Sequence, residues 1–574
     1  MALQWQDRSQ IAMTSEMVSR YWPRILTFCF LAALAALLLL YHLGGRYLWQ
    51  DEAQTAVLAE RMLRFGRPLA YDGKNLVTID YFPTEDQTST GKRTVDPNAA
   101  VDYYVHRGDF KSDSTWIWHP WGQFLVEAIS LKSLGRTTWA ARLPFALAAI
   151  ITVLLLYLFV LQEFNSSLIA CLAALFLILN AFWILHCRQC RYYSLSSLFV
   201  VVTLISYAHW QNGGRWGAFA FIAAAWCWFQ VDFGTLWPVL LVLFADAFIA
   251  DRRHVWRPLT VAGCLAATLL PFIYYFQLWG RHVAPAKPWD DRFLRNLFNT
   301  NLYVAPMLVV IAAIVLLSRR WEGLAVRERR VATIACATIA AFIVWVPLVA
   351  PTSFLRYVII VAPVGSMLTA WVLVRGLGGA RTWPVWIGAA VFLLTPWLTW
   401  LIPSPSFYRA SGALRPELAI LRNQIFTDYP DPNGVVIEWL RHNSSPSDEI
   451  LINYEDLPLM FYLPNPIRGG IAAFRVEDDA QKAPDFIVLR KSVPWVHWSV
   501  YLAEFGRYSW NQIPLDAPDV KWGNNPDPAA LLAKSSPSAM IYVGRRISRT
   551  TTHSQEPDAG HALADPEPSE DRAK

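Results

Sequence analysis

The chain has 574 residues, of which 55% are hydrophobic and only 16% are charged, and its mean hydropathy is +0.28. This composition excludes an ordinary soluble protein, which would be more polar at this length. The formal net charge of +6 does not indicate nucleic-acid binding, because the basic residues gather in short loops between apolar runs, and we expect no nucleic-acid partner.

Apolar runs long enough to cross a membrane recur through the first 403 residues. A helix of roughly 20 apolar residues spans the ~30 Å hydrocarbon core of a bilayer. By this measure the sequence predicts about eleven transmembrane helices. They lie near residues 24–44, 141–160, 167–185, 192–209, 215–230, 235–250, 258–277, 302–318, 331–350, 357–374 and 383–402.

Short arginine-rich loops predict the orientation in the membrane, because basic short loops mark the cytoplasmic side. Such loops follow the predicted spans that end near residues 250, 318 and 374. With a cytoplasmic N-terminus, all three loops fall inside the cell. The two long polar segments, 45–140 and 403–574, then lie outside. The sequence therefore predicts a multi-pass protein of the cell (inner) membrane, with the first long loop and the C-terminal domain extracytoplasmic.

Two adjacent carboxylates, Asp51 and Glu52, follow the first apolar run. Residues 52–66 and 120–134 have the apolar periodicity of helices that lie in the interface plane. Neighbouring residues on a helix point about 100° apart, so Asp51 and Glu52 are not expected to form a shared acid pair. One of the two side chains can face a cavity while the other has a supporting, structural role. The alternative is that Asp51 is the N-cap of the helix 52–66.

Other polar residues stand at the outer ends of predicted spans. His119 precedes Pro120 and is either a base or ligand, or a cap of the helix that Pro120 starts. Arginines at span ends commonly extend their charge to the membrane surface. A guanidinium can also bind a phosphate. Four arginines fall on the outer face and suggest a site for an anionic lipid: Arg142, Arg188, Arg191 and Arg356.

The sequence becomes more polar after Pro403. Residues 434–441 read as a helix, and residues 449–452, 485–489 and 539–543 read as short strands. We therefore predict three parts: a transmembrane domain over 1–403, a small extracytoplasmic α/β domain over 404–549, and a disordered tail over 550–574.

Short motifs follow one another at the ends of the apolar runs. They are Trp49-Gln50-Asp51-Glu52, His119-Pro120, Arg142-Leu143-Pro144, Arg191-Tyr192-Tyr193, and Arg356-Tyr357 with Pro363. Their order, spacing and topology resemble the membrane-embedded GT-C glycosyltransferases. The branch concerned contains the protein O-mannosyltransferases and the lipid A aminoarabinose transferases (glycosyltransferase family 39-like).

The resemblance implies a bundle of transmembrane helices, with interfacial helices over an outward-facing cavity. It implies that a sugar moves from a polyprenyl-phosphate donor to a hydroxyl of a glycan, lipid or protein acceptor in the cell envelope, with inversion. Asp51 would be the base, with Glu52 and His119 in the catalytic site. The donor phosphate would be bound by residues of the later motifs: Arg142, Arg191, Arg356, Tyr192 and Tyr357.

Some features stay open at this point. A divalent cation on the donor phosphate is compatible with Asp51 and Glu52 as ligands, but the sequence does not decide whether one is bound. No other cofactor is expected. A transporter or flippase of lipid-linked sugars is the main alternative, although the charges gather at span ends rather than at the bilayer midplane. A non-catalytic membrane scaffold is a third hypothesis.

Overall fold

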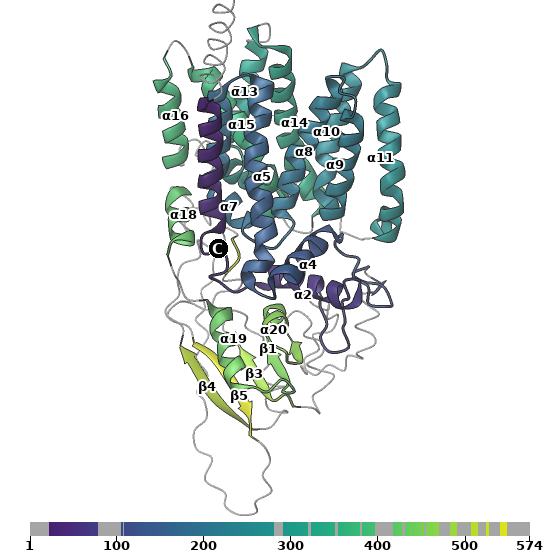
Figure 1. Cartoon of the computed structure of the whole chain (residues 1–574), viewed down its shortest axis with the longest axis vertical. Helices are drawn as coiled ribbons and strands as arrows, with labels where there is room; N and C mark the ends of the chain where they lie inside the picture. Colours follow the sequence, from purple (N-terminus) through teal and green to yellow (C-terminus); the bar gives the residue numbers. More distant parts are fainter. Residues whose placement is uncertain are drawn as a thin grey trace, which may run out of the picture.

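A computed structural model describes most of the chain. The described residues are 22–78, 105–106, 108–280, 291–319, 323–350, 354–378, 381–395, 417–427, 431–452, 455–469, 483–490, 507–514, 524–526 and 540–547. They form a bundle of long helices with a small sheet beyond one of its ends (Figure 1). The boundary near residue 403 and the tail 550–574 lie outside the described residues.

Seven helices in the described part are long and apolar enough to cross a membrane. They are Trp22–Leu40, α5 (Thr138–Phe164), α8 (Tyr193–Gln211), α10 (Phe233–Ala250), α11 (Trp256–Tyr275), α14 (Val326–Val349) and Ile359–Leu377, which comprises η4 (Ile359–Val361) and α15 (Ala362–Leu377). Two shorter apolar helices, α9 (Gly217–Val231) and α16 (Trp383–Leu394), accompany them. The chain is a multi-pass membrane protein, as predicted.

Two further helix pairs meet the same criteria of length and composition only together, and each pair is sharply bent. Helices α6 (Ser167–Ile178) and α7 (Ala181–Cys187) meet at 65°, and α12 (Asp291–Tyr303) and α13 (Met307–Arg319) meet at 79°. The two bends lie next to each other. Asn180, the N-cap of α7, donates a hydrogen bond from its side chain to the carbonyl of Tyr303 at the end of α12, at 2.7 Å. Backbone groups freed inside a membrane need such internal partners. With both bent pairs and both shorter helices, each predicted span coincides with a helical segment.

Two helices cross the end of the bundle between the spans and the sheet (Figure 1). They are α2 (Gln50–Phe65) and α4 (Gly122–Leu134), and both were predicted. In α4, Gln123 and Glu127 are fully buried, whereas Leu125 and Ile129 are more than half exposed. The helix also begins after Pro120, at Gly122, where an added Cβ would lie 2.5 Å from the Gln230 carbonyl oxygen. Close packing against α9 therefore determines where α4 starts.

The C-terminal part contains a mixed five-stranded sheet with the order β2-β1-β3-β5-β4. The strands are β1 (Ile450–Ile452), β2 (Ile467–Gly469), β3 (Phe486–Leu489), β4 (Tyr508–Pro514) and β5 (Met540–Arg546). β1 pairs in parallel with β2 and β3, and β5 is antiparallel to β3 and β4. The other helices here are α18 (Glu417–Ile425), α19 (Pro432–Asn443) and α20 (Asp456–Tyr462), and α20 packs on α2. The sequence indicated α19 and three strands but not α20, β2 or β4.

Candidate functional site

Asp51 lies in the first turn of α2 at the end of the bundle nearest the sheet. The N-cap of this helix is Trp49, so the alternative role of Asp51 as a cap is wrong. Its carboxylate instead forms an ion pair with Arg356 and lies 4.0 Å from the Arg191 guanidinium. The Asp51 side chain keeps 22% of its surface exposed. An accessible carboxylate therefore sits between two arginines.

Arg191 is held by the next turn of α2. One terminal nitrogen donates to Gln54 Oε1 and to Thr55 Oγ1, each at 3.1 Å. These residues stand three and four positions after Asp51, so they share its side of the helix. The sequence analysis missed both, although this spacing could have revealed them. The acceptor atoms of Gln54 and Thr55 orient the guanidinium group of Arg191, which is almost fully buried.

Arg356 lies in a short 3₁₀ turn, η3 (Leu355–Tyr357), just before the span that starts with η4. The Ser197 hydroxyl on α8 donates to the Ile360 carbonyl at 3.1 Å, which ties η4 to α8. The Arg356 guanidinium lies 5.5 Å from the Tyr357 ring centroid, and that of Arg191 lies 5.8 Å from the Tyr192 ring centroid. Aromatic faces at these distances attract a cation.

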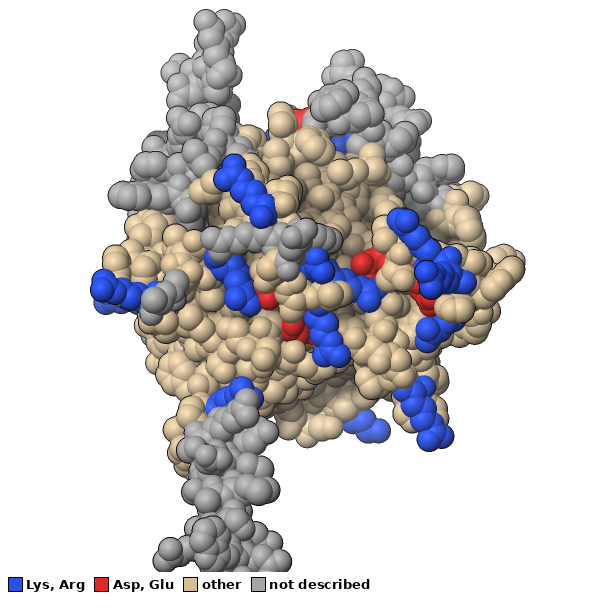
Figure 2. All heavy atoms as spheres, turned by 90° about the horizontal axis from the view of Figure 1, so that it is seen from above, with Lys and Arg blue, Asp and Glu red and all other residues tan. Residues whose placement is uncertain are grey.

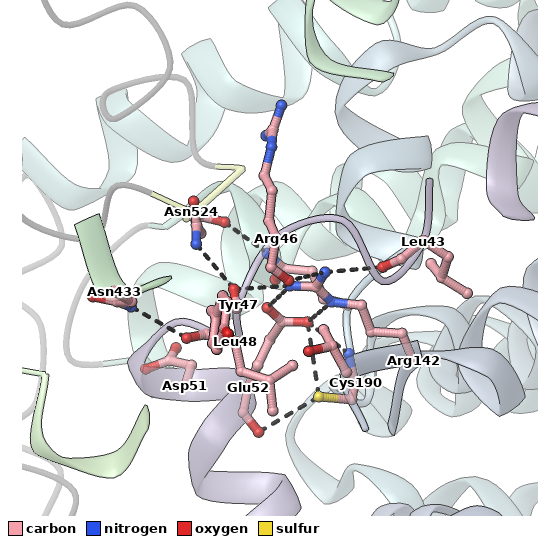
Figure 3. Close-up of polar contacts among 12 residues, drawn as sticks. Leu43, Arg46, Tyr47, Leu48, Asp51, Glu52, Arg142, Cys190, Asn433 and Asn524 are labelled. Atoms are coloured by element: carbon pink, nitrogen blue, oxygen red, sulfur yellow. Dashed lines mark hydrogen bonds and ion pairs between the residues drawn. The ribbon is translucent and has the colours of Figure 1, made fainter. Parts of the chain in front are cut away.

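Glu52 and Arg142 form a separate, buried pair (Figure 3). The Arg142 Nε and one terminal nitrogen donate to the two Glu52 oxygens at 2.7 and 2.6 Å. Arg142 also donates to the carbonyls of Leu43, Arg46 and Tyr47 at 3.0–3.3 Å. Both residues were expected at the substrate, but their polar atoms are used within the protein. These contacts connect the segment before α2 to the N-terminal part of α5.

The five predicted donor-site residues thus separate into two groups. Arg191 and Arg356 flank Asp51, and the rings of Tyr192 and Tyr357 lie beside these two arginines. Arg142 instead binds Glu52. A cavity of about 720 Å³ opens beside Arg142 and is also lined by Arg46, Arg188 and His42. His119, the remaining predicted site residue, is half-buried and packs against the rings of Trp116 and Phe124.

Glu127 on α4 is a buried carboxyl group that the sequence analysis did not identify as a site residue. Its nearest polar neighbours include Glu52, the Cys190 thiol and Arg191. Burial, together with the charge of Glu52, raises the pKa of Glu127 well above its ordinary value. Burial and a nearby like charge both favour the neutral form of a carboxyl group. Glu127 thus places a second buried carboxyl group beside Glu52.

The C-terminal part binds the segment that leads into α2. The Tyr47 amide donates to Asp431 at 2.5 Å, the Asn433 side chain donates to the Leu48 carbonyl at 3.2 Å, and the Tyr47 hydroxyl binds Glu438. Figure 3 shows Asn433 and Asn524 approaching this segment from one side and Arg142 from the other. The position of Asp51 therefore depends on contacts between residues almost 400 positions apart.

Gly434 allows this contact, and we expect Gly434→Ala to weaken it. An added Cβ would lie 2.8 Å from Cδ2 of Tyr47. Overpacking of this kind typically costs about 1–3 kcal/mol, so the unfolding midpoint of the purified protein should fall. Gly263→Ala is the matched control, because nothing lies within 4 Å of its added Cβ. Equal unfolding midpoints for the two variants would contradict the proposed packing.

No cluster of three or more His, Cys, Asp or Glu side chains that could hold a metal ion occurs in the described ranges. Of the two carboxylates expected as ligands, Glu52 uses both oxygens on Arg142. A divalent cation at this site would therefore have Asp51 as its carboxylate ligand.

No family model matches the chain, and no curated protein matches it. Among solved structures, it is similar to ArnT from Cupriavidus metallidurans bound to undecaprenyl phosphate, with a TM-score of 0.56 and 14% identity over 92% of this chain and 99% of that one. The apo state of the same ArnT gives a TM-score of 0.54 and 13% identity over 92% and 98%. The chain therefore has the GT-C fold that its motifs predicted.

Proposed function

We propose that this protein is an integral-membrane glycosyltransferase that moves a sugar from a polyprenyl-phosphate donor to an acceptor hydroxyl. One observation carries the proposal: a partly exposed carboxylate, Asp51, lies between the guanidinium groups of Arg191 and Arg356 at one end of a membrane bundle. The shared fold with ArnT, one structure of which contains undecaprenyl phosphate, supports a lipid-linked donor.

The residues around Asp51 suit an inverting displacement. Asp51 would take the proton of the acceptor hydroxyl as its oxygen attacks the anomeric carbon. The bond from that carbon to the phosphate oxygen breaks, and the lipid phosphate leaves with the bonding electrons. Arg191 and Arg356 are already oriented, so they can stabilise the growing phosphate charge without reorganising. The acceptor would be a hydroxyl of a glycan, lipid or protein.

The ion pair between Asp51 and Arg356 connects donor binding with activation of the base. A donor phosphate between the two arginines would compete with Asp51 for the Arg356 guanidinium, because phosphate accepts bidentate hydrogen bonds from arginine. Release from Arg356 would leave Asp51 a stronger base toward the acceptor. Donor binding would thus precede acceptor activation.

The distribution of charge supports the proposed orientation of the site. Arg252, Arg257 and Arg381 are exposed at the opposite end of the bundle. Figure 2 looks onto that end and shows Lys and Arg side chains gathered there, with few carboxylates between them. Since basic loops favour the cytoplasm, Asp51 and the sheet would lie outside the cell membrane.

We expect Arg356→Ala to reduce turnover by about 100–1,000-fold, as for the loss of one preorganised donor to a developing oxyanion. The purified protein in detergent would be given synthetic polyprenyl-phosphate sugars with a cell-envelope extract as the acceptor source. Release of polyprenyl phosphate is the readout. Arg295→Ala is the control, because Arg295 is an exposed arginine that also pairs with an aspartate, Asp291.

The same assay separates the two main hypotheses. A transferase converts the donor in detergent, where no membrane barrier exists. A flippase would leave the donor intact in detergent and would move it only across sealed vesicles. That second result would overturn the proposed function.

A further inference from the structure

A second cavity lies at the opposite end of the bundle from Asp51. It holds about 680 Å³ of open space, part of which is continuous with solvent. Helices α5, α8, α14 and α15 form its walls. Its apolar lining includes Phe159, Leu204, Ile334, Val364 and Met367. Such a lining suits a hydrocarbon chain.

Two polar groups in this apolar lining have no hydrogen-bond partner in the described part of the chain. They are Oε1 of Glu163, whose residue is 6% exposed, and Oγ1 of Thr338, whose residue is 1% exposed. Both residues line the cavity. A buried polar atom without a partner is costly and calls for a specific explanation. A ligand that donates hydrogen bonds to Glu163 would provide one.

Two arginines line the same cavity, and only Arg327 is available to bind a ligand. Arg330 donates to Asp246 at 2.7 Å and to Gln211 at 2.9 Å, so its charge is compensated. Arg327 is exposed, and no hydrogen bond or ion pair engages it among the described residues. Its charge acts on Glu163. The cavity therefore offers a cation and a carboxyl group beside an apolar wall.

We propose that this cavity binds a phospholipid with a phosphoethanolamine headgroup. The phosphate would lie at Arg327, the ammonium group would donate to Glu163, and the upper part of an acyl chain would lie along the apolar wall. An ethanolamine headgroup satisfies both charges of the cavity. A choline headgroup has the same two charges but no N–H to donate. A glycerol headgroup has hydroxyl donors but no positive charge for Glu163.

Native mass spectrometry of the purified full-length chain would test the proposal, with matched-chain phosphatidylethanolamine, phosphatidylcholine and phosphatidylglycerol as probes. We expect phosphatidylethanolamine to bind roughly tenfold more tightly than phosphatidylcholine, the effect of one hydrogen bond to a charged group. Glu163→Gln should remove this preference. Arg327→Gln should weaken both zwitterionic lipids equally and keep the preference. Arg253→Gln, an exposed arginine outside the cavity lining, should change neither.

Three outcomes would overturn the proposal: equal binding of ethanolamine and choline lipids, tightest binding of phosphatidylglycerol, or a preference that survives Glu163→Gln. If Glu163→Gln fails to fold, Arg327→Gln still tests the cavity. Unchanged lipid binding by Arg327→Gln would then exclude the proposed site. None of these measurements depends on sugar transfer.

Discussion

Asp51→Asn should reduce sugar transfer by about 1,000-fold while leaving the fold intact. Amide replaces carboxylate with almost the same shape, so packing in the first turn of α2 is kept. The amide cannot take a proton from the acceptor, and general base catalysis of this kind contributes about 100–10,000-fold. Initial rates with a polyprenyl-phosphate sugar, together with the unfolding midpoint, would measure both effects.

Asp251→Asn is the matched control for this prediction. The Asp251 side chain is also 22% exposed and also pairs with an arginine, Arg257, at 3.5 Å, but it lies at the opposite end of the bundle. It should keep full activity. If Asp51→Asn folds and transfers sugar at the rate of the unaltered protein, Asp51 is not the base. Loss of activity in both variants would indicate an effect of membrane insertion rather than of catalysis.

The number of predicted transmembrane helices before each charged residue predicted which of these residues lie at the same end of the bundle. Each crossing reverses the chain, so apolar runs of the right length place Asp51, Arg191 and Arg356 on the same face. The structure brings these three together, across as many as 305 positions. The bends at Asn180 and before α13 were not predicted, because hydropathy gives the composition of a segment and not its direction.

The role of Arg142 could not be read from the sequence for a different reason. Its partners include the carbonyls of Leu43, Arg46 and Tyr47. Every residue has a carbonyl, so their arrangement depends on the loop conformation and leaves no pattern of residue types. The contact of Tyr47 with Asp431 could not be predicted either, because it joins residues that are 384 positions apart.

Glu52→Gln should lower the free energy of unfolding by about 3–5 kcal/mol, the usual cost of removing one partner of a buried ion pair. Glu52 is fully buried, and its carboxylate accepts two hydrogen bonds from Arg142 and one from the Cys190 amide. The neutral amide would leave the Arg142 charge without compensation. Denaturant unfolding followed by tryptophan fluorescence, beside the transfer rate, would measure the loss.

The double variant Glu52→Leu with Arg142→Met separates a positioning role from a catalytic one. Replacing both charges with apolar side chains removes the uncompensated charge, so the double variant should be more stable than Glu52→Gln. Its stability should remain below that of the unaltered chain, because the carbonyls of Leu43, Arg46 and Tyr47 lose their donor. Transfer should stay low in both variants, since Asp51 is no longer held in place. A Glu52→Gln protein of unchanged stability with a low transfer rate would instead place Glu52 at the substrate.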